Sequence, residues 1–346
     1  MNVPGKDSRI AVIGAGAVGG VVASLVSGAG YNVEIVCKHE GLADRIRTEG
    51  IHLFGARGEH RVVMPAVACV SELKEKKDIV FLATKATDML DVAERLIPFL
   101  KDTSVAVSLQ NGICEDALGW ILGRERIVGC VVGWGSTMHS PGEIEMTSTG
   151  EFVIGNIDNK TDPRLRSIGD MLKTVAPVEI SDNIMGSLYA KLIINSCITS
   201  LGAICGLYLG EMLSDRKIRN IFVEIMREAM AVADAMELHV EDYGGKINYY
   251  KLLRGYGFVD NLKRHMLIRI IGFKYRRLKS SSLQSLERGK PTEIDFLNGY
   301  IARNGEEYDV PVPVNNRIIS MIKEIEGNRR KISPDNFNYP LFSGFA

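Results

Sequence analysis

A glycine-rich turn near the start of the chain has residue types and spacing that suit phosphate binding. Residues 14–19 read Gly-Ala-Gly-Ala-Val-Gly, a GxGxxG pattern between an apolar run over 9–13 and a helical pattern over 18–29. Gly14 would permit a tight turn, Gly16 would let the backbone approach a pyrophosphate, and Gly19 would let the helix pack against the strand. The helix N-terminus favours the anion. The residues predicted to bind a dinucleotide here are Gly14, Ala15, Gly16, Ala17, Val18 and Gly19.

The end of the next apolar run, 32–37, indicates which dinucleotide the turn would bind. An NAD site usually carries an acid at this point, which holds the ribose 2′-hydroxyl. Here Lys38 follows the run, so a cation stands where the acid would be. Lys38 could pair with a 2′-phosphate, and the pattern therefore favours NADP(H). Two alternatives stay open: Glu34 has about the right offset from Gly14 but falls mid-strand, where a charge usually faces solvent, and Lys38 could be an ordinary solvated loop lysine.

Apolar runs alternate with helical patterns over the N-terminal half of the chain. Runs rich in β-branched residues at 78–83 and 104–109 flank an amphipathic pattern at 87–100. Such alternation predicts βαβ units and a parallel sheet. Between 132 and 155 the pattern changes to alternation of polar and apolar residues with turns. This change predicts an antiparallel extension of the same sheet.

The strand patterns stop near residue 180. Helical periodicity then dominates at 188–199, 215–236, 291–304 and 314–327. The predicted fold class is α/β, with an N-terminal Rossmann-type doubly wound sheet followed by an all-α C-terminal domain. The predicted parts are a dinucleotide-binding domain over 1–181, a helical substrate and catalytic domain over 182–331, and an extended C-terminal tail over 332–346. Residues 240–280 show no clear period and are interpreted as an insertion or lid.

Composition argues against several other classes of protein. Lys plus Arg and Asp plus Glu each total 42, so the formal net charge is zero and gives no bulk electrostatic case for nucleic acid or an anionic membrane. The six cysteines and six histidines show no metal-ligand spacing, so no metal site is expected. No signal-peptide pattern opens the sequence, which favours a cytoplasmic protein. The helical patterns at 215–236 and 314–327 could supply a homodimer surface.

One stretch, 192–210, carries no charge and has nearly the length of a membrane span. It contains three glycines and four polar residues, Asn195, Ser196, Thr199 and Ser200, whereas a span needs about 20 predominantly apolar residues. It is therefore interpreted as a buried helix followed by a turn. Lys191 stands at its head, and Asn195, four residues later, shares the same helix face.

These features resemble the ketopantoate reductase (2-dehydropantoate 2-reductase) family. The matching pieces are 14–20 (GAGAVGG), Thr84-Lys85, Gln110-Asn111-Gly112, Ser140-Pro141-Gly142, 191–195 (KLIIN), 280–284 (SSSLQ), Glu293-Ile294-Asp295, Asn298-Gly299 and 310–313 (VPVP). The resemblance covers nearly the whole chain in the right order, except for 240–275. It implies reduction of a 2-oxo acid to its 2-hydroxy acid by hydride from NADPH.

The resemblance also implies roles for particular residues. Lys191 matches the general acid that protonates the carbonyl oxygen, and Glu293 matches the carboxylate that orients the lysine and the substrate. Asn195 matches a residue that hydrogen-bonds substrate, and Ser281 matches a hydroxyl that holds the substrate carboxylate. The residues that match the lining of the nicotinamide and substrate cleft are Asn111 and Lys85.

Two positions depart from the family pattern. Thr199 stands where many members have a second asparagine, and Leu278 stands where some have an asparagine. Both positions face the substrate in the family, so Thr199 is also predicted to bind substrate. These changes leave the cofactor and chemistry intact but leave the identity of the 2-oxo acid open.

The implied chemistry suits the residue types. Hydride addition to a ketone builds negative charge on oxygen, which a positioned ammonium can stabilise and then protonate. Without the resemblance, Lys191 would be a solvated lysine, and Glu293 would compensate a helix dipole. Three functions stay open: a ketopantoate reductase serving pantothenate and coenzyme A synthesis, a reductase of another bulky 2-oxo acid, and a non-catalytic dinucleotide-binding redox sensor.

Overall fold

The computed structural model describes residues 5–160, 162–255 and 257–343. The chain forms two units, Met1–Leu188 and Tyr189–Ala346. The sequence placed this boundary at 181/182, just before helix α6 (Ile184–Cys205), whereas the units divide inside α6. The first turns of α6 pack on the sheet, since a Cβ added to Gly129 would lie 2.9 Å from Ile184 and 3.0 Å from Leu188.

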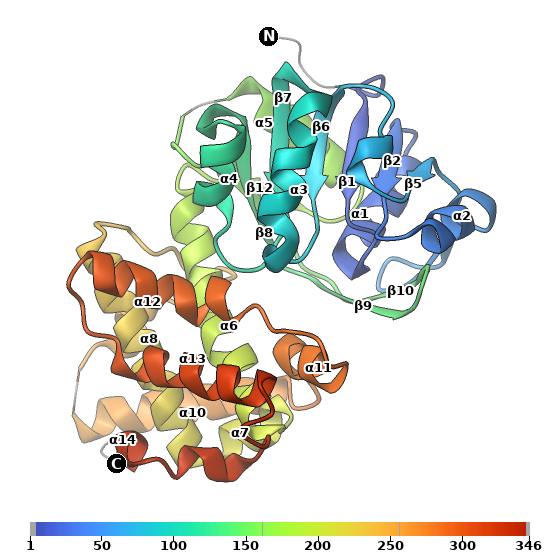
Figure 1. The fold of residues 1–346 in the computed structure, drawn as a ribbon. Helices are drawn as coiled ribbons and strands as arrows, with labels where there is room; N and C mark the ends of the chain where they lie inside the picture. Colours follow the sequence, from blue (N-terminus) through green and yellow to red (C-terminus); the bar gives the residue numbers. More distant parts are fainter. Residues whose placement is uncertain (1–4, 161, 256, 344–346) are drawn as a thin grey trace. The chain divides into compact units, whose positions relative to one another are not determined.

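The first unit is built on an eight-stranded, mostly parallel sheet (Figure 1). In spatial order its strands are β12 (Val178–Ile180), β11 (Phe152–Asn156), β8 (Ile127–Val132), β7 (Leu100–Ser108), β6 (Lys77–Leu82), β1 (Ile10–Ile13), β2 (Val33–Val36) and β5 (Ala66–Val67). From β1 the chain adds β2 and β5 on one side, and it adds β6, β7 and β8 on the other. The direction of the strand order therefore changes between β1 and β6, which makes this place a topological switch point. The pairs of the sheet are parallel except β11 with β8.

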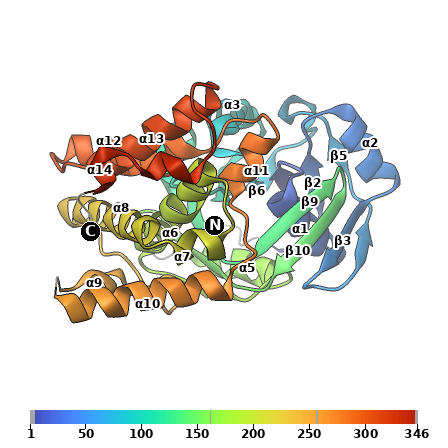
Figure 2. The same cartoon turned by 90° about the horizontal axis from the view of Figure 1, so that it is seen from below.

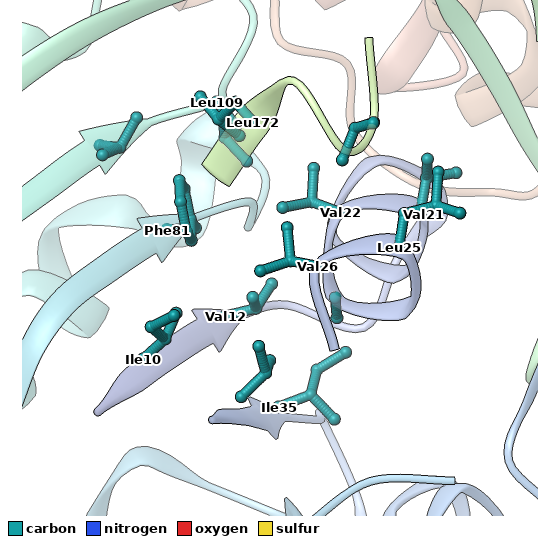
Figure 3. Packing of buried hydrophobic residues seen from close by; sticks show 14 of the residues in the cluster. Ile10, Val12, Val21, Val22, Leu25, Val26, Ile35, Phe81, Leu109 and Leu172 are labelled. Atoms are coloured by element: carbon teal, nitrogen blue, oxygen red, sulfur yellow. The ribbon is translucent and has the colours of Figure 1, made fainter. Parts of the chain in front are cut away.

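Helices cover both faces of this sheet, as the prediction of a doubly wound fold requires. They are α1 (Ala17–Gly28), α2 (Glu40–Thr48), α3 (Met89–Leu96), α4 (Glu115–Leu122) and α5 (Pro163–Leu172). Helices α3 and α4 pack together, and α1 contacts α5 (Figure 1). Because β1 is covered on both faces, all four of its residues are buried and apolar. Figure 3 shows β1 and β2 packing against α1 through Val12, Val22, Val26 and Ile35.

The prediction for residues 132–155 was only partly right. Strand β11 does extend the main sheet in the antiparallel sense. Hairpin β9 (Gly135–Ser140) and β10 (Glu143–Ser148) instead joins β3 (Ile51–Gly55) and β4 (His60–Val62) in a second sheet of order β4-β3-β10-β9. The cause is apolar burial: Ile144 pairs with Leu53, both have no exposed surface, and Ile144 also packs on Gly20 of α1.

The second unit is helical, as predicted, apart from an isolated bridge between Tyr243 and Ile247 in the part of the chain that the structure describes. Its longer helices beside α6 are α7 (Leu209–Ser214), α8 (Arg216–Ala235), α10 (Phe258–Lys274), α11 (Ser281–Glu287), α12 (Asn298–Glu307) and α13 (Pro313–Glu326). Helix α6 is long and apolar enough to cross a membrane, but 83% of its most apolar window is buried. It is therefore interpreted as a core helix.

In this unit one helix begins later than predicted, and a segment without a clear sequence period proves to contain helices. The helix predicted at 291–304 begins only at Asn298, after a 3₁₀ turn over Ile294–Phe296, because Glu326 accepts hydrogen bonds from the Thr292 backbone and hydroxyl at 2.8 and 2.7 Å. Residues 240–280, for which no helix was predicted, contain α9 (Tyr249–Leu253) and α10.

The tail over 332–346 was expected to be extended. Instead it contains a 3₁₀ turn over Pro334–Phe337 and the short helix α14 (Pro340–Ser343). The rings of Phe337 and Phe342 lie 6.2 Å apart and both are buried, so apolar burial folds the tail back.

Candidate active site

The glycine-rich turn has the steric properties that its sequence predicts. Gly14 has φ +109°, and its N–H donates to Val36 O at 2.9 Å. A Cβ at Gly14 would lie 2.8 Å from Ala83 O, and one at Gly19 would lie 1.9 Å from Gly14 O. Any larger residue at either place would push α1 off the sheet. Gly16 is the N-cap of α1, and a Cβ there would meet nothing within 4 Å. The turn is thus packed on its inner side and open at Gly16, which suits the approach of a pyrophosphate.

Two further motif segments lie on the carboxyl ends of the adjacent strands β6 and β7. Gln110 donates from Nε2 to Thr84 Oγ1 at 3.1 Å, which ties the loop after β7 to the loop after β6. Thr84 in turn lies against the turn, because a Cβ on Gly14 would be 3.0 Å from Thr84 N. Lys85, which is exposed, and Asn111, which is half-buried, directly follow these two residues. The structure therefore brings the turn, Lys85 and Asn111 to one edge of the sheet.

Lys38 also follows a strand that ends at this edge, β2. Its side chain is 85% exposed, and Nζ lies 3.1 Å from Asp88 Oδ2. Glu34 was expected to face solvent, but its side chain is only 16% exposed and forms an ion pair with Lys77. Lys77 opens β6, at the opposite end of that strand from Thr84. The ion pair with Lys77 therefore directs the Glu34 side chain toward the amino-terminal end of β6.

The sequence did not indicate Glu115, which lies just beyond Asn111. Glu115 is the first residue of α4 and has no exposed surface. Its Oε2 accepts a hydrogen bond from Cys114 N at 2.8 Å, while burial raises the pKa of its carboxyl to about 7. An acid at a helix start normally compensates the dipole at the surface. Its burial depends on tertiary packing that no local pattern reveals.

In the helical unit, three predicted substrate-site residues lie on α6. Lys191, Asn195 and Thr199 are spaced four apart and follow one face of the helix. Lys191 and Asn195 are half-buried, and Thr199 is 8% exposed. The Thr199 hydroxyl donates to Asn195 O at 2.8 Å. This bond occupies the hydroxyl proton but leaves lone pairs on the oxygen.

Ser281 begins α11 and is exposed. The preceding Ser280 caps the helix, since its Oγ accepts from Leu283 N at 3.1 Å. A Cβ on Gly202 of α6 would lie 2.8 Å from Ser280 Oγ, so the start of α11 packs directly on the second half of α6. This close approach fixes where Ser281 lies relative to α6.

Glu293 precedes the 3₁₀ turn that leads into α12, and it is half-buried. Five residues later, the fully buried Asn298 donates from Nδ2 to Ser196 O at 3.2 Å and to Asn315 Oδ1 at 2.9 Å. Ser200 donates its hydroxyl to Asn298 Oδ1. These bonds attach the start of α12 to the middle of α6, at Ser196 and Ser200.

The same network continues to α8. Asn315 donates from Nδ2 to Glu228 Oε2 at 2.7 Å, and Glu228 also accepts from the backbone N–H groups of Val314 and Asn315. Burial raises the pKa of the Glu228 carboxyl. The sequence offered Asn298 only as part of a motif, and Glu228 carried no signal. Both position α6 and α12 without being predicted site residues.

Comparisons with known proteins agree with this arrangement. Residues 10–159 match the family Ketopantoate reductase PanE/ApbA, and residues 183–326 match Ketopantoate reductase PanE/ApbA C terminal. A 2-dehydropantoate 2-reductase of Archaeoglobus fulgidus is 27% identical over 324 residues, which cover 93% of this chain and 99% of the relative.

Solved structures give the same result. A PanE/ApbA family ketopantoate reductase from Ralstonia eutropha JMP134 is 29% identical with TM-score 0.79, covering 93% of this chain and 100% of that chain. A D-mandelate dehydrogenase solved with NADH and anilino(oxo)acetate shares the fold at 21% identity and TM-score 0.80, with 93% and 99% covered.

The fold, a mostly parallel sheet with an open glycine turn followed by a helical unit, together with the family match, places the protein in the class of oxidoreductases. The chain belongs to the ketopantoate reductase PanE/ApbA family and is a 2-dehydropantoate 2-reductase-like oxidoreductase.

Proposed function

We propose that the protein reduces 2-dehydropantoate (ketopantoate) to pantoate with NADPH, in the cytoplasm, as a step toward pantothenate and coenzyme A. The observation that carries the proposal is the α6 face of Lys191, Asn195 and Thr199, to which the Asn298 network attaches the segment after Glu293. Full-length relatives with this name support the substrate.

The chemistry follows from what each side chain can donate. The nicotinamide, when bound, supplies the hydride. The Lys191 ammonium stabilises the negative charge that develops on the substrate carbonyl oxygen and delivers a proton to it. Asn195 donates a hydrogen bond to the substrate, and the Ser281 hydroxyl donates to the substrate carboxylate. Glu293 restricts the ammonium to the productive orientation by charge and hydrogen bonding.

The turn from Gly14 to Gly19 would hold the pyrophosphate, with Lys85 and Asn111 beside the nicotinamide. The open space at Gly16 and the uncapped start of α1 fit such a group. Lys38 would pair with the 2′-phosphate, because it is an exposed cation directly after β2. Glu34, the competing candidate for a ribose hydroxyl, is already paired with Lys77.

A second candidate is the reduction of another bulky 2-oxo acid. Thr199 and the 41% exposed Leu278 stand where family members have asparagines, and a D-mandelate dehydrogenase has the same fold. Initial rates of reduced-nicotinamide oxidation decide between them, with ketopantoate and 2-oxoisovalerate as substrates and NADPH or NADH as donor. Fast, NADPH-selective turnover of ketopantoate is expected. Equal turnover of both acids would refute ketopantoate as the specific substrate.

A further inference from the structure

A chain of polar side chains joins the two loops that carry Lys85 and Asn111. Gln110, which is buried, donates from Nε2 to Thr84 Oγ1 at 3.1 Å, and its Oε1 accepts from Ser108 Oγ at 3.4 Å. Ser108 has no exposed surface. Because Asn111 directly follows Gln110 and Lys85 directly follows Thr84, the orientation of the Gln110 amide helps to fix both loops.

The backbone of Ser108 is fixed in the sheet, so only its hydroxyl can turn. Ser108 ends β7 and pairs with Leu82 of β6 on one side and with Gly129 of β8 on the other. The N–H of the next residue, Leu109, donates to Leu82 O at 2.8 Å. The hydroxyl has one proton and rotates to suit its partners. Its 3.4 Å bond to Gln110 is longer than the usual distance of about 2.5–3.0 Å, so this proton is not firmly committed to Gln110.

The second partner of the Ser108 hydroxyl is Glu115, the fully buried acid at the start of α4. Burial is the main influence on the pKa of this carboxyl and raises it to about 7, while interactions with its own N–H, with Cys114 N and with the Ser108 side chain lower it. Oε2 accepts from Cys114 N, whereas the buried Oε1 has no hydrogen-bond partner among the described residues. In a neutral carboxyl the proton therefore belongs on Oε1, which then needs an acceptor.

The two protonation states of Glu115 give Ser108 opposite roles. When Glu115 is neutral, its proton is donated to a lone pair of Ser108 Oγ, and the Ser108 proton is left for Gln110 Oε1. When Glu115 is ionised, its carboxylate takes the Ser108 proton, because a hydrogen bond to a charged acceptor is stronger than one to a neutral amide. Gln110 Oε1 then loses its donor, and the amide can turn away from Thr84.

The charges around Glu115 leave its burial as the main influence. On α4, the neighbouring Asp116 raises the pKa of the Glu115 carboxyl after burial, and Asp116 is itself paired with Arg124 of the 3₁₀ turn Arg124–Arg126. The other elements packed on α4 are β8, which carries no charge, and α3 (Figure 2). The remaining charged residues of α3 and of the 3₁₀ turn are exposed or half-buried, and they are Asp91, Glu94, Arg95, Glu125 and Arg126. Burial and the adjacent acid thus both favour a neutral Glu115.

We propose that Glu115 is a positioning residue for the reaction, which in its neutral form holds Gln110, through Ser108, in the orientation that presents Lys85 and Asn111 to the nicotinamide. The inference rests on the proposed function for the place of the nicotinamide, whereas the hydrogen bonds from Glu115 to Gln110 belong to the free protein. Ionisation of Glu115 releases Gln110, so dinucleotide affinity should fall as the pH rises.

Side-chain amide NMR of Gln110 in the full chain tests the hydrogen bonds without any ligand. The Gln110 amide resonances, assigned by their loss in Gln110→Met, should shift in the wild type as the pH rises from about 5.5 to about 8.5. Glu115→Gln stays neutral and should abolish this shift. Ser108→Ala keeps the titrating acid but removes the connecting hydroxyl, and should abolish most of it. An unshifted wild-type resonance, or an equal shift in Ser108→Ala, overturns the proposal.

NADPH affinity, measured by fluorescence titration, tests the consequence for the site. The ratio of the wild-type Kd to the Glu115→Gln Kd cancels the titration of other groups, including the 2′-phosphate. We expect a ratio near one at about pH 6 and about three to ten at about pH 8, the effect of one hydrogen bond. Asp116→Asn is the matched control and should follow the wild type at both pH values.

The outcomes separate this proposal from the proposed function. Equal NADPH affinities of the wild type and Glu115→Gln at about pH 8 overturn the positioning role of Glu115, even if ketopantoate is turned over. Absence of NADPH binding at both pH values instead refutes the dinucleotide site of the proposed function. The pH titration of the Gln110 amide then decides by itself whether Glu115 controls Gln110.

Discussion

Thr199 donates its hydroxyl proton to the backbone carbonyl of Asn195, one turn earlier on α6, at 2.8 Å. The donor of this side chain is therefore committed within the helix, and only its oxygen lone pairs can serve a bound molecule. An asparagine at the same place would offer both a donor and an acceptor. The substrate specificity of this chain should depend on that difference.

Removing the Thr199 oxygen should discriminate between two substrates. Thr199→Val keeps the shape but leaves no acceptor for the hydroxyl group of ketopantoate. We expect kcat/KM for ketopantoate to fall about tenfold, the effect of one lost hydrogen bond of about 1.4 kcal/mol. 2-Oxoisovalerate lacks that hydroxyl and should be unaffected. An equal loss for both acids would mean that Thr199 acts only on the packing of α6.

Removing the Lys191 ammonium should strongly lower turnover and leave dinucleotide binding intact. We expect Lys191→Ala to lower kcat by about 10²–10⁴-fold, the usual contribution of a positioned general acid. NADPH affinity, measured by fluorescence titration, should stay within twofold. Lys173→Ala, at the exposed end of α5, is the control and should keep wild-type kcat. Normal turnover by Lys191→Ala would rule out the general-acid role, while absence of turnover in the wild type would favour a redox sensor.

Selectivity for NADPH should depend on Lys38 and on Asp88, the acid that would compete with the 2′-phosphate for the Lys38 ammonium. Lys38→Ala should raise the Kd of NADPH about 10- to 100-fold, because a charge-assisted hydrogen bond contributes about 1.5–3 kcal/mol. The Kd of NADH should not change. Asp88→Asn releases Lys38 from its ion pair and should tighten NADPH binding. If neither variant alters the ratio of the affinities for NADPH and NADH, a group other than Lys38 distinguishes the two dinucleotides.

The parts of the fold that the sequence predicted are those fixed by local chemistry. The glycine turn could be predicted because backbone sterics at Gly14 and Gly19 allow no other residue. The β9–β10 hairpin was assigned to the wrong sheet, since its alternation is the same whichever distant strand it joins. Only the burial of Ile144 against Leu53 decides this.

Helix α10 was missed for a different reason. Its buried side includes Arg264 and Gly272, while its exposed side carries Phe258 and Ile270, so its apolar pattern points away from the core. Periodicity identifies a helix by its apolar face and assumes that this face is buried. In the site, the motif residues could be found from their types, but the Asn298 network joins residues about one hundred positions apart. No local pattern contains such a contact.

That network should stabilise both the fold and the reaction. Asn298→Ala leaves buried groups of Ser200 and Asn315 without a partner, and each unsatisfied group costs about 1–3 kcal/mol. We expect a loss of about 2–4 kcal/mol in the free energy of unfolding by urea, and a fall in kcat larger than any change in KM. Asn304→Ala removes one half-buried bond within α12 and should cost less than about 1 kcal/mol. If both variants lose a similar free energy of unfolding, the Asn298 network contributes no more than an ordinary hydrogen bond within a helix.

Glu115 should make stability depend on pH in the neutral range. Burial raises the pKa of its carboxyl from 4.5 to about 7, so the ionised form is disfavoured in the folded state. The stabilising contribution is present in full below about pH 4.5 and is lost as the pH rises through 7. The loss by pH 8 is about 3 kcal/mol at 1.36 kcal/mol per pKa unit.

Glu115→Gln keeps a neutral side chain with an acceptor for Cys114 N at every pH. We therefore expect the variant to match the wild type in urea stability at about pH 4 and to exceed it at pH 8 by up to about 3 kcal/mol. The control is Asp116→Asn, whose side chain is 43% exposed in its ion pair with Arg124 and should follow the wild-type pH profile. If Glu115→Gln is less stable than the wild type at pH 8, the carboxylate is the form that the folded protein prefers, and Glu115 is an ionised cap of α4.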